Sequence, residues 1–85
     1  MATAIVQHRV EDFNTWKQAY DAHEGRKKHG FRDKVLQVAD DPNNVVIILE
    51  TDNLEGLQEF LRSDDLKAAM GAAGVIGQPN LFVCS

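Results

Sequence analysis

His8 is the residue of this chain best suited by type and position to acid–base chemistry. It lies in a segment that alternates apolar and polar residues, and it shares a face with Ala4, Val6 and Val10. An imidazole in an apolar cleft can take or give a proton near neutral pH, because its ordinary pKa is about 6.5. The alternative is a structural histidine near a strand end that hydrogen-bonds to loop backbone, and the sequence leaves both interpretations open.

Three further side chains with chemical potential follow at helical spacing. Trp16, Tyr20 and His23 are separated by four and three residues, which places them on one face of a helix. This face offers an aromatic wall with polar tips: Trp16 would stack on a planar ligand, and Tyr20 and His23 would hydrogen-bond to its oxygens. A core-facing stripe whose polar ends reach solvent would show the same spacing. For a catalytic role, we expect His8→Ala or Tyr20→Phe to abolish turnover without lowering the melting temperature.

Two phenylalanines are additional candidates for lining a ligand site. Phe31 follows the first helical segment and Phe60 lies in the second. A cleft that holds His8 with Tyr20 or His23 would favour an enzyme or a ligand binder. A cleft filled by Phe31, Phe60, Leu61 and Met70 would instead favour a non-catalytic module.

The sequence holds no recognisable metal or phosphate motif. His8, His23 and His29 lack a known ligand spacing, and the acidic run at residues 40–44 is too short for a calcium loop. The glycines at positions 71, 74 and 77 follow a helical segment, whereas a phosphate loop opens one. We therefore expect no metal site and no cofactor.

Length and charge limit the remaining possibilities. The 85 residues are enough for one domain, residues 1–85, and the net charge of −4 argues against nucleic acid. The basic cluster at residues 26–29 is interpreted as complementing a helix dipole, with an anion site as the alternative. A single cysteine, Cys84, allows no internal disulfide, and we expect no catalytic thiol there. No signal peptide or membrane span is indicated, so we expect a cytoplasmic protein without a membrane partner.

The elements that must position these residues follow a clear order. Strands are predicted at residues 4–10, 34–39, 45–50 and 80–84, and helices at residues 13–28 and 54–73, the second divided at Ser63 by a new N-cap. We expect Asp52 or Asn53 to cap the start of the second helix, Gly30 to stop the first, and Pro79 to mark entry to the last strand. This βαββαβ order predicts an α+β, ferredoxin-like sandwich with a four-stranded antiparallel sheet.

One strand carries more apolar residues than a lone two-layer domain requires. Residues 45–49 are consecutively apolar, which indicates burial on both faces, yet two helices can cover only one face of the sheet. We therefore expect a partner on the other face, and a second copy of the chain is the simplest one.

Two stretches carry a family resemblance across nearly the whole chain. Residues 8–17, HRVEDFNTWK, and residues 63–70, SDDLKAAM, resemble the dimeric α/β-barrel superfamily. The chain is most similar to small proteins related to antibiotic-biosynthesis monooxygenases and polyketide cyclases. The resemblance implies two sheets facing each other across a two-fold axis, with a cleft in each subunit between sheet and helices. It also implies aromatic or polyketide-like substrates.

The chain departs from this family's functional patterns in two respects. Cofactor-free monooxygenases of this type use an Asn, a Trp and an Arg around the substrate, and this trio cannot be placed residue by residue here. Haem-degrading relatives need a histidine on the second helix, but no histidine follows His29, so haem is not expected. The leading hypothesis is cofactor-independent oxygenation or proton-transfer cyclisation in a homodimer. The rival is a non-catalytic dimeric module that binds a metabolite or serves as a scaffold.

Overall fold

The computed structural model describes residues 2–23 and 30–84. These residues form four strands, β1 (Ala2–Val10), β2 (Arg32–Val38), β3 (Asp41–Thr51) and β4 (Val75–Cys84), and three helices, α1 (Phe13–Ala22), α3 (Leu54–Arg62) and α4 (Asp64–Ala72). The strands form one antiparallel sheet in the order β2-β3-β1-β4. This is the predicted ferredoxin-like α+β fold, with β1 and its His8 in a central position.

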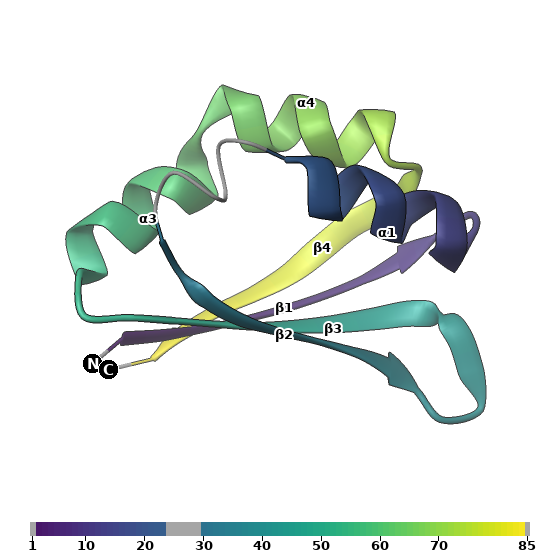
Figure 1. Ribbon diagram of the computed structural model, residues 1–85, viewed down its shortest axis with the longest axis horizontal. Helices are drawn as coiled ribbons and strands as arrows, with labels where there is room; N and C mark the ends of the chain where they lie inside the picture. The colour runs from purple at the N-terminus through teal and green to yellow at the C-terminus, as the bar shows by residue number, and fades with distance from the viewer. Residues whose placement is uncertain (1, 24–29, 85) are drawn as a thin grey trace.

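The molecule has two layers, a sheet and a layer of helices. Figure 1 shows α1, α3 and α4 on the same side of the sheet, and none of the described helices lies over the opposite face. The inner face of β1 alternates regularly, with Ala4, Val6, His8 and Val10 buried toward the helices. The core forms where this face meets Val45, Ile47 and Leu49 of β3 and Trp16, Leu57 and Phe60 of the helices. The alternation predicted for β1 is thus confirmed, and His8 lies on the helix side.

Short polar side chains set the helix boundaries. Asp12 caps α1 by accepting from the Thr15 backbone N–H at 3.0 Å, and Asn53, one of the two predicted caps, does the same for α3. Ser63 ends α3 and begins α4: its hydroxyl donates to the Phe60 carbonyl and accepts from the Leu66 N–H. The predicted division of the second helix at Ser63 is therefore confirmed.

The predicted first helix was too long. It ends at Ala22, and His23 is its extended C-cap, so Gly30 does not stop it. The ring of this C-cap residue lies against Phe60 of α3 and Asp65 of α4. The rest of the predicted helix, residues 24–28, and the basic cluster at residues 26–29 lie outside the described residues.

All four strands are longer than predicted. β2 and β3 approach each other to a two-residue turn at residues 39–40, so Pro42 lies in β3 and not in a loop. β4 begins at Val75, which places Pro79 inside it. β4 is an edge strand, where the missing proline N–H is tolerated.

The pairing of β1 with β4 is interrupted beside His8. Gln7 pairs with Asn80 and Arg9 pairs with Ile76, so three residues of β4 lie opposite His8 alone. Gly77 in this segment has a φ of 71°, a conformation that glycine adopts without strain. Irregularities of this kind occur next to functional sites in many sheets, where they re-aim a side chain.

Candidate active site

An apolar cavity lies between the inner face of the sheet and the helices, and His8 forms part of its wall. It measures about 50 Å³, and Trp16, Tyr20, His23, Phe60 and Met70 are among its other lining residues. The structure thus brings together His8, Trp16, Tyr20, His23 and Phe60 of the predicted site residues. Phe31 does not line the cavity; it packs edge-on against Phe60, with ring centroids 5.2 Å apart.

His8 is almost completely buried and has no polar partner within the described part of the chain. Its exposed fraction is 2%, and neither Nδ1 nor Nε2 has a hydrogen bond to another described residue. Buried polar groups are nearly always hydrogen-bonded, so an unpartnered imidazole on a cavity wall is exceptional. The alternative from the sequence, a histidine satisfied by loop backbone, is not what the described residues show.

Burial also determines the charge of His8. Loss of hydration disfavours the imidazolium form, so the pKa of His8 is lowered from its ordinary value of 6.5. The ring is therefore neutral at physiological pH, with one nitrogen able to accept a proton and the other carrying one.

The aromatic residues of α1 form a continuous stack beside His8. Trp16, with 2% exposure, places its ring 5.5 Å from that of His8 at an interplanar angle of 69°. Tyr20 stacks on Trp16 at 5.0 Å and 22°. α1 can present this stack because its offsets of four residues return each ring to the same face, and the Phe13 N–H is fixed to the Asn43 side chain of β3.

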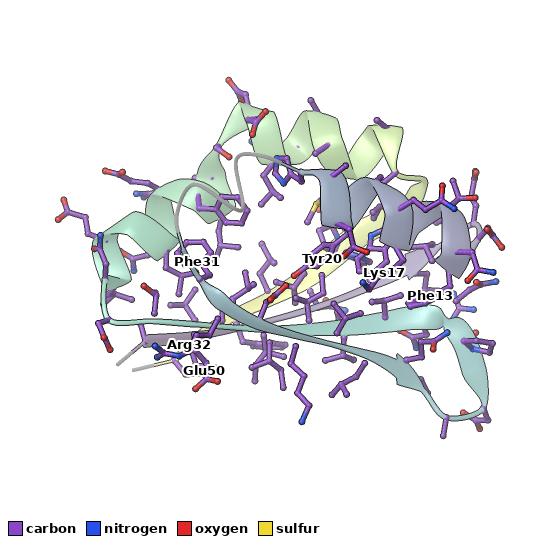
Figure 2. The ribbon with its side chains drawn as sticks, viewed as in Figure 1. Phe13, Lys17, Tyr20, Phe31, Arg32 and Glu50 are labelled. Atoms are coloured by element: carbon purple, nitrogen blue, oxygen red, sulfur yellow. The ribbon has the colours of Figure 1, made fainter. Side chains whose placement is uncertain are left out.

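Tyr20 and His23 have carboxylate partners that the sequence did not indicate. The Tyr20 hydroxyl donates to Asp33 Oδ2 at 2.5 Å, and Figure 2 shows Tyr20 reaching from α1 toward β2. His23 Nε2 lies 2.9 Å from Asp65 Oδ2 in the first turn of α4. Tyr20 therefore offers its oxygen to a ligand as an acceptor, and the donor role expected for His23 is already taken by Asp65 in this state.

The sequence did not predict Asp33 and Asp65 as partners of Tyr20 and His23, for a different reason in each case. Asp33 falls on the inner face of β2 only once that strand begins at Arg32, two residues before the predicted start. Asp65 has the residue type of a helix N-terminus, which explains it without a partner, and its contact with His23 joins residues 42 positions apart in the sequence. Continuing the alternation of β2 backward from Val35 would have identified Asp33.

Comparison with known proteins bears on the fold. No family model matches the chain, and no curated protein matches it. Among solved structures, an antibiotic biosynthesis monooxygenase superimposes with a TM-score of 0.75 at 13% identity, covering 100% of this chain and 97% of that one. SnoaB from Streptomyces nogalater, a cofactor-independent oxygenase, gives 0.71 at 17% identity, with coverages of 95% and 89%. A conserved protein from Methanosarcina mazei Go1 gives 0.74 at 15%, with coverages of 99% and 91%.

These likenesses establish that the chain has the ferredoxin-like fold of antibiotic biosynthesis monooxygenases. Identities of 13% to 17% say nothing about substrate. None of the described helices is long and apolar enough to cross a membrane.

Proposed function

We propose that the protein is a homodimeric enzyme that acts without a cofactor on an aromatic or polyketide-like molecule, by oxygenation or by proton-transfer cyclisation. The observation that carries this proposal is His8, neutral, buried and unpartnered among the described residues, on the wall of an apolar cavity. The fold shared with SnoaB, a cofactor-independent oxygenase, supports the class of chemistry.

In the proposed reaction His8 removes a proton from a carbon next to a carbonyl group. For cyclisation, the resulting enolate attacks a second carbonyl within the same molecule, and His8 returns the proton to the new alkoxide. For oxygenation, the enolate reacts with O₂ to form a peroxide, and loss of water turns the original CH₂ into C=O. Overall, CH₂ and O₂ become C=O and H₂O, and His8 returns its proton to the departing oxygen. Trp16 would stack on the aromatic ring, and Tyr20 would accept a hydrogen bond from a ligand hydroxyl.

The size of the cavity sets a condition on this chemistry. Pockets for drug-sized ligands measure about 300–1,000 Å³, well above the 50 Å³ found here. For a polycyclic ligand we expect α1 and α4 to separate, which would break the contact between His23 and Asp65. The small cavity is also what favours the second candidate, a dimeric module that binds a metabolite without converting it.

Solvent exchange distinguishes the two candidates. We would follow deuterium uptake from D₂O into the activated methylene of anthrone and of 2-tetralone by NMR, and record oxygen consumption in parallel. An enzyme accelerates exchange with or without O₂, and consumption of O₂ then separates oxygenation from proton transfer. His8→Leu should abolish the acceleration, and Gln37→Leu, a similar exchange outside the cavity, should retain it. If neither probe exchanges faster while one of them quenches Trp16 fluorescence, the binding module is the better description.

The proposed homodimer is supported by the outer face of the sheet. Six apolar residues lie on this face, and Leu36, Ile76 and Phe82 are 41%, 51% and 59% exposed; the others are Ile5, Val46 and Ile48. A monomeric protein rarely presents so much contiguous apolar surface. We expect light scattering to give twice the 9.5 kDa chain mass at micromolar concentration. A strict monomer would contradict the proposed assembly.

A further inference from the structure

A row of side-chain amides crosses the outer face of the sheet. Asn80 of β4 donates through Nδ2 to Gln7 Oε1 at 2.6 Å, and Gln7 of β1 donates through Nε2 to Asn44 Oδ1 of β3 at 2.6 Å. We call these three residues the amide row. The row ties three strands together, and Gln7, its middle member, lies near the centre of the central strand β1.

The amide row has apolar neighbours on one side, and Arg9 pairs with its member Asn44 on the other. Val46 pairs with Gln7 across β1 and β3 and with Leu36 across β2 and β3. On the next row of the same face Ile5 pairs with both Ile48 and Phe82. Polar groups at the centre of an apolar face restrict what can be stacked on that face, because a partner must meet them with polar groups of its own.

The chemistry of the row fits a second copy of itself. Each amide has two N–H donors and an acceptor oxygen with two lone pairs, so the internal bonds leave every member able both to donate and to accept. Near a two-fold axis a residue meets its own copy, and two amides can then pair reciprocally. Charges of both signs also occur on this face: Figure 2 shows Arg32 and Glu50 on the side of the sheet away from the helices.

We propose that the amide row fixes the orientation of the homodimer, with the two-fold axis passing near Gln7. This inference rests on the homodimer proposed above. The apolar residues supply the attraction but allow several ways of stacking two sheets, and the row selects one of them. A single polar residue in an apolar interface has this role in coiled coils, where it specifies register at a cost in stability.

The test measures orientation separately from association. A spin label on Gln18→Cys, an exposed position of α1, in a Cys84→Ser background gives the distance between the two copies by pulsed electron paramagnetic resonance. We compare the parent with Gln7→Leu and with Thr3→Val, a polar-to-apolar change on the same face outside the row. The parent and Thr3→Val should give one narrow distance distribution. Gln7→Leu should keep the dimeric mass and affinity but give a broad or multiple distribution.

Each other result is also decisive. A dimer with the same narrow distribution in Gln7→Leu overturns the proposed role of the row. A Gln7→Leu protein that folds but becomes monomeric overturns it too, because the row would then supply affinity. A parent protein that is monomeric overturns the homodimer itself. As a second arm, Gln7→Glu should weaken the dimer by about tenfold or more at pH 7, because two carboxylates would meet at the axis, and Thr3→Glu should weaken it less.

Discussion

At the scale of single residues, His8 lowers the stability of the folded protein and supplies the reactive group of the proposed chemistry. A buried polar group without a partner costs a protein about 1–3 kcal/mol. Such a cost persists where function requires it, as active-site residues are often poor for stability. The position of His8 could be predicted from the sequence, because the alternation along β1 placed it on an apolar face. That its ring has no polar partner among the described residues follows from the tertiary packing around it, which no local pattern indicates.

The exchange His8→Leu should separate activity from stability. General acid–base catalysis contributes about 10²- to 10⁴-fold, so turnover of an exchanging ketone should fall by at least about 100-fold. The melting temperature should stay the same or rise, because an apolar side chain suits the site better than an unpartnered imidazole. Both quantities come from the NMR exchange assay and a thermal melt of the same preparation. A drop of several degrees together with the activity would indicate a structural histidine.

The lowered pKa of His8 predicts a pH dependence of stability with a definite sign. Below pH 6.5 the unfolded chain protonates this histidine before the folded protein does, so the unfolded state binds more protons. The stability tied to neutral His8 is therefore fully present above pH 6.5 and is lost as pH falls toward the folded pKa. Urea unfolding at pH 7.5 and 5.5 should show a larger decrease for the parent than for His8→Leu. Equal decreases would mean that His8 titrates normally.

At the scale of elements, the helices cover the cavity, and we expect the contacts that hold them to limit access to it. The bond between His23 and Asp65 joins the end of α1 to the start of α4, and the bond between Tyr20 and Asp33 joins α1 to β2. Periodicity predicted the existence and order of these elements. It did not predict that α1 ends at Ala22, because the helical pattern continues in the sequence and the contacts of His23 with α3 and α4 join residues far apart in it.

Breaking the link between the helices should speed ligand entry. Asp65→Ala removes the carboxylate that holds His23, and we expect faster association of anthrone, measured by stopped-flow quenching of Trp16, the only tryptophan. Asp64→Ala is the matched control, since Asp64 has the same position type in the first turn of α4 but no bond to His23. Equal association rates for the two variants would show that this contact does not limit entry.

The cap shared by α3 and α4 should matter for stability. Ser63→Ala removes the acceptor for the Leu66 N–H and should cost about 1 kcal/mol, whereas Ser63→Asp, another good cap, should cost less. Denaturant unfolding of the two variants measures the difference. If Ser63→Asp is as destabilised as Ser63→Ala, the capping bond is not the source of the effect.

At the scale of the whole molecule, the two faces of the sheet have separate roles. The inner face builds the cavity with the helices, and the outer face keeps apolar residues that none of the described elements covers. The apolar run at residues 45–49 indicated apolar residues on both faces, and alternate residues of β3 do point to each side; burial of the outer face by a partner stays a prediction. The amide row was not predictable, since Gln7, Asn44 and Asn80 are far apart in sequence and meet only through the register of three strands.

The proposed dimer interface on the outer face of the sheet can be tested by placing a charge within it. Ile5→Lys puts two ammonium groups into the proposed interface and should give a folded monomer, seen by light scattering and circular dichroism. A dimer that survives this change would have to use another surface.

The central claim is that a ligand in the cavity meets the nitrogens of His8. The most direct measurement is ¹⁵N NMR of histidine-labelled protein at pH 7, with and without anthrone. We predict that His8 has the pattern of a neutral ring in the free protein and that its nitrogen resonances shift more than those of the other histidines when anthrone binds. Anthrone binding that quenches Trp16 fluorescence but leaves both His8 nitrogens unchanged would contradict the account.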